Sequence, residues 1–203
     1  MITSFLTLLQ SKYGVSFDDK AATYIDFAVD GAKRMRQLIL DLLEYSRVGK
    51  TDETIAFLDL NNLVEEIKIL YRQKIEELNA QVIVIGSFPQ IKCHKSPLFQ
   101  LFQNLISNAL KYSRTDVAPL VKIQAKSVDN FWQFVVEDNG IGIDEEYFEK
   151  IFVIFQRLHN KDEYSGTGLG LAVTKKIIDS LNGKIWLEST PNVGTKFYFT
   201  IPK

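Results

Sequence analysis

The first 50 residues repeat apolar side chains at the spacing of packed helices. The first run has spacings of four, three and four residues: Ile2, Leu6, Leu9 and Tyr13. From residue 16 to about 47 there is no proline, and spacings of four and three alternate: Tyr24, Ala28, Gly31, Met35, Leu38, Leu42 and Tyr45. This spacing keeps one helical stripe facing another helix, so it predicts two helices in an antiparallel hairpin. Gly14 ends the first, and Ser16 or Asp18 caps the second.

The two predicted helices differ in length. At about 1.5 Å per residue the second is roughly 45 Å long and the first about 20 Å, so half of the longer stripe lacks a partner in the chain. A first helix that begins uncapped at residue 1 indicates a helix cut in its middle, and a naturally short hairpin is the alternative. With Met35 and Leu38 left exposed, we expect weakened, altered or swapped association between hairpins.

A polar segment, residues 48–54, interrupts the helical pattern, and we place a domain boundary at residue 50. Beyond it, helical and alternating segments are interleaved. Helices are predicted over residues 60–78, 97–112, 147–159 and 169–182, and strands over 81–86, 121–128, 131–138, 184–190 and 194–202. The predicted fold is α+β: residues 1–50 form the helical hairpin, and residues 51–203 form an α/β sandwich with a mixed, mostly antiparallel sheet and helices on one face.

Composition excludes several classes of function. With 46% hydrophobic and 24% charged residues the chain is globular, and a net charge of −1 offers no positive excess for nucleic acid or an anionic membrane. The single cysteine, Cys93, cannot form an internal disulfide, which favours the reducing cytoplasm. His94 and His159 form no obvious metal cluster with it. No apolar run predicts a membrane span, and the first residues do not resemble a signal peptide.

Glycine is concentrated where chemistry is expected. Seven of the eleven glycines lie between residues 140 and 194, and five of these fall in D-N-G-I-G-I at 138–143 and G-T-G-L-G-L at 166–171. A glycine run that leads into a helix aims unpaired N–H groups and the positive helix end at an anion, which predicts phosphate binding. A flexible turn is the alternative, because neither the Rossmann fingerprint nor a P-loop is present.

A second candidate site is the helical segment N-L-I-S-N-A-L-K-Y at residues 104–112. Asn104, Asn108, Lys111 and Tyr112 are spaced so that one helical face carries two amides, an ammonium and an aromatic ring. Such a face can hold a metal ion and phosphate oxygens, or it can simply be solvated. Asp138 likewise has an ordinary interpretation, as an acid that caps a turn.

Five motifs resemble, in order, the N, G1, F, G2 and G3 boxes of sensor histidine kinases: N-L-I-S-N-A-L-K-Y, V-E-D-N-G-I-G-I, I-F-V-I-F-Q-R-L-H, G-T-G-L-G-L-A and G-T-K-F-Y-F. The helix pair ending in E-Y-S-R-V resembles the end of their dimerisation and histidine-phosphotransfer domain. The stretch S-F-L-T-L-L-Q-S-K-Y-G is similar to phytochrome-like kinases. The resemblance covers essentially the whole chain.

The resemblance implies a site for ATP and Mg²⁺. Asn108 would ligate Mg²⁺, with Asn104 and Lys111 near the phosphates, and these three would be the catalytic residues. Asp138 would accept a hydrogen bond from the adenine amino group. Phe152 and Phe155 would anchor a lid over residues 156–165, or would simply pack in the core. The nucleotide would further contact Tyr112, Gly140, Gly142, Gly166, Thr167, Gly168, Leu169, Gly170 and Thr195.

The activity implied is ATP-dependent phosphorylation of a protein histidine, for relay to an aspartate of a response-regulator receiver domain. Related ATPases of the gyrase and chaperone group use a glutamate to activate water at the position of Asn104. An amide cannot take a proton at neutral pH, so transfer to a protein nucleophile is favoured over hydrolysis. The alternatives are an ATP-driven conformational clamp and a scaffold that lacks the acceptor.

The acceptor histidine of the family lies on the first hairpin helix, in a motif like H-D-L-x-E-P-L-R, and M-I-T-S-F-L-T-L-L resembles the stretch that follows it. His94 and His159 lie elsewhere. We therefore expect the acceptor upstream of Met1, and a chain that binds ATP with Mg²⁺ without phosphorylating itself. We also expect a cytoplasmic homodimer, paired through the hairpin, with no nucleic-acid or membrane contact.

Overall fold

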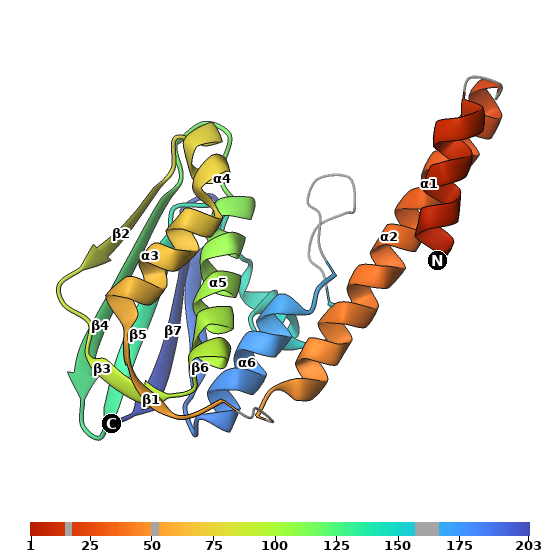
Figure 1. The fold of residues 1–203 in the computed structure, drawn as a ribbon. Helices are drawn as coiled ribbons and strands as arrows, with labels where there is room; N and C mark the ends of the chain where they lie inside the picture. Colours follow the sequence, from red (N-terminus) through yellow and green to blue (C-terminus); the bar gives the residue numbers. More distant parts are fainter. Residues whose placement is uncertain (15–17, 50–52, 157–166) are drawn as a thin grey trace. The chain divides into compact units, whose positions relative to one another are not determined.

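The computed structural model describes residues 1–14, 18–49, 53–156 and 167–203. These residues form two compact units, Met1–Glu44 and Tyr45–Lys203 (Figure 1). The domain boundary at residue 50 stays a prediction.

The first unit is a helical hairpin, as the apolar spacing predicts. It consists of α1 (Ile2–Tyr13) and α2 (Asp19–Arg47) as far as Glu44, and α2 runs back along α1 (Figure 1). The Asp18 carboxylate accepts a backbone N–H of the first turn of α2 at 2.7 Å and caps this helix. Between the two helices, Gln10 Nε2 donates to Asp26 Oδ1 at 2.5 Å.

Most apolar side chains of the hairpin are exposed. Among the hairpin side chains that the structure describes, Val29 alone is buried. Met35 is exposed as predicted, whereas Leu38 is half-buried. Exposed apolar side chains in such number are typical of an interaction surface. They are Met1, Ile2, Phe5, Leu8, Leu9, Tyr13, Tyr24, Phe27, Met35, Ile39, Leu40, Leu42 and Leu43.

The second unit is built on a five-stranded sheet with the strand order β2-β4-β5-β7-β6. β2 and β4 are parallel, and the other neighbours are antiparallel. The two predicted hairpins, β4–β5 and β6–β7, are confirmed. Their turns include Asp129 and Asn192, which have φ angles of 47° and 61°. The strands are β2 (Gln81–Ile85), β4 (Leu120–Val128), β5 (Phe131–Asp138), β6 (Ile185–Thr190) and β7 (Gly194–Pro202).

Helices cover one face of this sheet, which confirms the predicted fold class (Figure 1). Three phenylalanines join the layers: the ring of Phe102 on α5 lies 5.8 Å from that of Phe134 and 5.5 Å from that of Phe199. All three side chains are fully buried. The helices are α3 (Leu60–Leu70), α4 (Arg72–Glu77), α5 (Lys95–Lys111) and α6 (Gly170–Ser180).

The structure differs from the sequence-based prediction at three places. β1 (Ala56–Asp59) and β3 (Gln90–Cys93) form a separate two-stranded sheet that was not predicted. The helix predicted over residues 60–78 is interrupted at Tyr71, although the Tyr71 N–H and C=O still make helical hydrogen bonds. In place of a helix over 147–159 there are two 3₁₀ turns, Glu145–Tyr147 and Lys150–Phe152, and residues 157–159 lie outside the described part.

Replacing Gly183 with alanine tests the junction between α6 and the sheet. A Cβ at Gly183 would overlap the Thr200 carbonyl oxygen of β7, so the strand or the turn must move. We expect Gly183→Ala to lower the free energy of unfolding of this unit by roughly 2 kcal/mol or more. Urea titration of tryptophan fluorescence measures this, because both tryptophans, Trp132 and Trp186, belong to the second unit.

Gly86→Ala is the matched control. Gly86 has a φ of +79° but open space around a Cβ, so only backbone strain of about 1–2 kcal/mol is expected. Equal losses in the two variants would contradict the steric argument.

Candidate functional site

The polar face of α5 meets the start of α6 at Asn104. Asn104 Nδ2 donates to the Gly170 carbonyl oxygen at 3.0 Å and lies 3.5 Å from Thr174 Oγ1. The buried Thr174 hydroxyl donates to the same carbonyl at 2.9 Å. The sequence analysis named Asn104 and Gly170 separately, and the structure brings them together. Thr174 was missed, because a threonine inside a helix carries no signal of its own.

The other end of α5 contacts the loop that follows β5. Lys111 Nζ donates to Tyr112 Oη at 2.8 Å and lies 4.3 Å from the centre of its ring. The Tyr112 carbonyl oxygen accepts the Ile141 N–H at 3.0 Å. The Asn108 amide, one turn earlier, is half-buried and makes no hydrogen bond with the described residues. Lys111 and Tyr112 are thus placed beside the predicted base pocket.

Asp138 is the last residue of β5, and its two carboxylate oxygens differ in their hydrogen bonds. Its Oδ1 accepts the Gly140 N–H at 2.8 Å and the Thr195 N–H at 3.3 Å. Its Oδ2 has no partner among the described residues. Burial raises the pKa of Asp138 to about 6, the two backbone hydrogen bonds oppose this rise, and the charge of Glu137 adds to it.

Glycine is required where this loop passes its neighbours. A Cβ at Gly140 would lie 2.5 Å from the Tyr112 carbonyl oxygen and 2.9 Å from Asp138 Oδ1. Gly142 has a φ of 72°, and a Cβ there would overlap the Thr190 carbonyl oxygen. The predicted role of these two glycines in shaping the pocket agrees with this close packing and stays a prediction.

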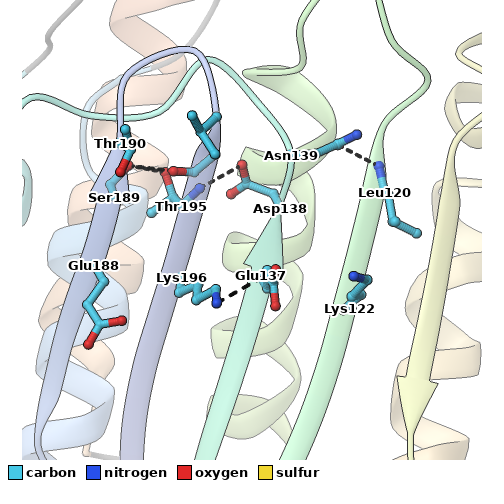
Figure 2. A pocket seen from close by; sticks show the side chains of 12 residues that line it. Leu120, Lys122, Glu137, Asp138, Asn139, Glu188, Ser189, Thr190, Thr195 and Lys196 are labelled. Atoms are coloured by element: carbon cyan, nitrogen blue, oxygen red, sulfur yellow. Dashed lines mark hydrogen bonds and ion pairs between the residues drawn. The ribbon is translucent and has the colours of Figure 1, made fainter.

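A cavity of about 320 Å³ opens beside Asp138 (Figure 2). It includes Asp138 and Thr195 but not the polar face of α5. Lys122, Glu137 and Lys196 alternate with residues that face the helices, so the cavity reaches Asp138 from the uncovered side of the sheet. It is lined by Leu120, Lys122, Glu137, Asp138, Asn139, Glu188, Ser189, Thr190, Val193, Gly194, Thr195 and Lys196.

The glycine-rich segment is described only from Thr167 onward. Gly168 has a φ of 77°, and the buried Leu169 precedes α6, which begins at Gly170. Gly166 and the predicted lid beyond residue 156 lie outside the described residues.

The two predicted lid anchors have different environments. Phe152 packs against the core, whereas Phe155 is 54% exposed and has a φ of 65°. Such a φ is strained for a bulky residue. Core packing, the alternative interpretation, therefore applies to Phe152 but not to Phe155.

Three further findings bear on ligands. Within the described ranges, no group of three His, Cys, Asp or Glu side chains is arranged to hold a metal ion. None of the helices described is both long and apolar enough to cross a bilayer. His94 directly precedes α5, and its Nδ1 is buried with no hydrogen-bond partner in the described part of the chain. His159 lies outside the described residues.

Comparison with known sequences gives one family and several relatives. Residues 93–203 match the family described as histidine kinase-, DNA gyrase B- and HSP90-like ATPase. Phytochrome-like protein Cph1 of Synechocystis is 45% identical over 99% of this chain. Sensor protein kinase WalK of Staphylococcus haemolyticus is 31% identical, also over 99%. The chain spans 27% of the first relative and 34% of the second.

Two solved structures extend these findings. A histidine kinase ThkA in complex with response regulator protein TrrA has a TM-score of 0.67 at 27% identity, covering 100% of this chain and 57% of that one. Full-length ShkA in complex with AMPPNP has a TM-score of 0.73 at 22% identity, covering 99% of this chain and 42% of that one, and shows the likeness of fold.

The raised pKa predicts that Asp138 destabilises the ligand-free fold at neutral pH. The folded-state pKa of about 6 lies above the ordinary value near 3.8. The stability lost by burying the ionised carboxylate is therefore small below pH 4 and reaches its full value above pH 6. Asp138→Asn removes the charge, and its advantage in unfolding free energy should be about 1–2 kcal/mol larger at pH 8 than at pH 4.5. Urea titrations at both pH values measure this difference.

Asp129→Asn serves as the control, because Asp129 lies in the exposed β4–β5 turn. It shows what the same change of Asp to Asn does at a site outside the pocket. An Asp138→Asn effect that is the same at both pH values would contradict the argument from burial.

Proposed function

This chain belongs to the family of histidine kinase-, DNA gyrase B- and HSP90-like ATPases, and we propose that it is the ATP-binding catalytic part of a two-component sensor histidine kinase. It is homologous to phytochrome-like and WalK kinases. The proposed reaction transfers the γ-phosphate of ATP to a histidine, for relay to an aspartate of a response regulator.

The observation that carries the proposal is the arrangement at Asp138. Two backbone N–H groups hold Oδ1, so the carboxylate is fixed and Oδ2 remains as an acceptor. A carboxylate accepts hydrogen bonds and cannot donate them, so it selects a ligand that presents a donor. The amino group of adenine is such a donor. Gly140 packs closely against both this carboxylate and the Tyr112 carbonyl oxygen, which brings Tyr112 to the same loop.

Residues of α5 suit the phosphate end of the nucleotide. The Asn108 amide is uncommitted, and its oxygen is a ligand that Mg²⁺ accepts. Lys111 supplies a positive charge one turn away, close to the base pocket through Tyr112. Bound Mg²⁺ would neutralise charge on the phosphates. Asn104, Asn108 and Lys111 would position the phosphates for transfer. Positioning and charge neutralisation suffice, because phosphoryl transfer requires little covalent chemistry from the protein.

Asn104 supports a kinase rather than a clamp that hydrolyses ATP. Its amide donates to the Gly170 carbonyl oxygen and has no basic lone pair with which to activate water. We extend the proposal to Gly166, Thr167, Gly168, Leu169 and Gly170, which would close on the phosphates.

The proposed partners are a second copy of the chain and a receiver domain. The exposed apolar side chains of α1 and α2 support pairing of two hairpins into a four-helix bundle. The likeness to ThkA, whose structure is a complex with response regulator TrrA, supports the receiver domain. Cys93 is a free, buried thiol, which agrees with a cytoplasmic location.

Asp138→Asn should weaken ATP binding about 10- to 100-fold, the range expected for a hydrogen bond with a charged partner. The asparagine oxygen must stay on the N–H groups of Gly140 and Thr195, so its NH₂ group would face the adenine amino group and repel it. Calorimetric titration with Mg²⁺–ATP measures the affinity, with Asp129→Asn as the control. Unchanged ATP affinity in Asp138→Asn would contradict the proposed base pocket.

We also propose that the acceptor histidine lies outside these 203 residues, since neither His94 nor His159 is on the hairpin. Incubation with Mg²⁺ and ATP labelled at the γ-phosphate should leave no acid-labile label on the chain and release little phosphate. Label that disappears in His94→Gln or His159→Gln would refute this assignment. Rapid steady-state phosphate release without a phosphoprotein would favour the clamp instead.

A further inference from the structure

The Ser189 hydroxyl, on β6, lies where the loop after Asp138 meets the β6–β7 hairpin (Figure 2). Its oxygen is 2.8 Å from each of three groups: the Ile143 backbone nitrogen, the Gly194 carbonyl oxygen and Thr195 Oγ1. Ser189 was not among the residues that the sequence motifs indicate. In the folded chain it is the point at which three segments of the base pocket are joined.

The chemistry of these neighbours fixes the direction of each hydrogen bond. A hydroxyl has one proton and two lone pairs. The Gly194 carbonyl can only accept, so the Ser189 O–H donates to it. The Ile143 N–H can only donate, so it occupies one lone pair of the Ser189 oxygen. The second lone pair then accepts the hydroxyl proton of Thr195.

The directions of these hydrogen bonds determine whether the Thr195 hydroxyl can donate to a ligand or only accept from it. With its proton directed to Ser189, the Thr195 hydroxyl has only lone pairs left for another group. The Thr195 backbone N–H is bonded to Asp138 Oδ1, and Asp138 and Thr195 line the same cavity (Figure 2). Thr195 Oγ1 and Asp138 Oδ2 are therefore two acceptors on residues that the Thr195 N–H holds together through Asp138 Oδ1.

Backbone contacts hold Ser189 in this position. The Asn192 N–H donates to the Ile141 carbonyl oxygen at 2.7 Å, and Arg114 Nη1 donates to the Asn192 carbonyl oxygen at 2.7 Å. Independently of Ser189, the first contact holds the β6–β7 turn on the loop after Asp138, and the second holds it on the segment that follows α5. Removing the Ser189 hydroxyl should therefore change the direction of the Thr195 proton more than it changes the fold.

We propose that Ser189 is a positioning residue that sets base specificity, by keeping the Thr195 hydroxyl an acceptor beside Asp138. The proposal rests on the adenine site proposed above. This pair of acceptors favours a purine with a 6-amino group, which donates. It disfavours a purine with a 6-oxo group, which accepts, because two acceptors would then face each other.

The test compares ATP with inosine 5′-triphosphate, which carries a 6-oxo group. Calorimetric titrations of the whole chain with Mg²⁺ give both affinities and their ratio. In Ser189→Ala the Thr195 hydroxyl is free to turn and donate, so the preference for ATP should fall about three- to tenfold, as expected for one neutral hydrogen bond. Ser189→Thr keeps the oxygen and should restore the preference.

Ser180→Ala is the matched control, because Ser180 is an exposed residue of α6 that bonds only to its own helix. It should keep the wild-type ratio. Ser189→Cys retains the volume with a weak acceptor and should shift the ratio in the same direction as Ser189→Ala. If Ser189→Ala does not fold, the ratio of the two affinities in Ser189→Cys tests the role of Ser189 instead.

Two results would overturn the inference, and they are distinguishable. If Ser189→Ala weakens both nucleotides by the same factor, Ser189 has only a structural role, and the adenine site stands. If the wild-type chain binds the two nucleotides equally, the adenine site itself is wrong, and the inference fails with it.

Discussion

The proposed base pocket of this chain depends on backbone packed directly against backbone. The loop after β5 passes so close to the β6–β7 turn that a Cβ at Gly142 would overlap the Thr190 carbonyl oxygen. A Cβ at Gly194, where φ is 140°, would overlap the Asp138 carbonyl oxygen in the same way. Glycine supplies both the missing side chain and the unusual φ. This contact brings the Thr195 N–H to Asp138 and the Ser189 hydroxyl to Ile143, so the other hydrogen bonds of the pocket follow from it.

The same contact places a carboxylate where water solvates it poorly. Burial raises the pKa of Asp138 to about 6, against two hydrogen bonds that favour the ionised form. Burying this charge lowers the stability of the fold but fixes a hydrogen-bond acceptor in place. A ligand that donates to Asp138 Oδ2 would offset the loss. A site that is strained without its ligand is what selection for binding, rather than for stability, tends to leave. The proposed binding role and local stability therefore oppose each other at this residue.

The sequence predicts the long, periodic helices and strands. It does not predict the elements and side-chain roles that depend on contacts between residues far apart in the chain. α5 and the β4–β5 and β6–β7 hairpins have clear periods and turn residues, and they form as predicted. β1 and β3 have only four residues each, and Ala56 pairs with Cys93, so no local pattern could indicate them. Ser189 was missed for the same reason. A serine in a strand is ordinary until the fold places the loop after Asp138 beside it.

The last turn of α2 is attached to α6 within the second unit. Tyr45, in the last turn of α2, already belongs to the second unit, and Lys176 Nζ donates to its carbonyl oxygen at 2.5 Å and lies 4.1 Å from the centre of its ring. Lys176 is on α6, whose first residue, Gly170, accepts from Asn104. Both contacts lie within the second unit, because Tyr45 and Lys176 belong to it. They therefore attach the residue at which this unit begins to the helix that starts at Gly170, at the proposed phosphate end of the site.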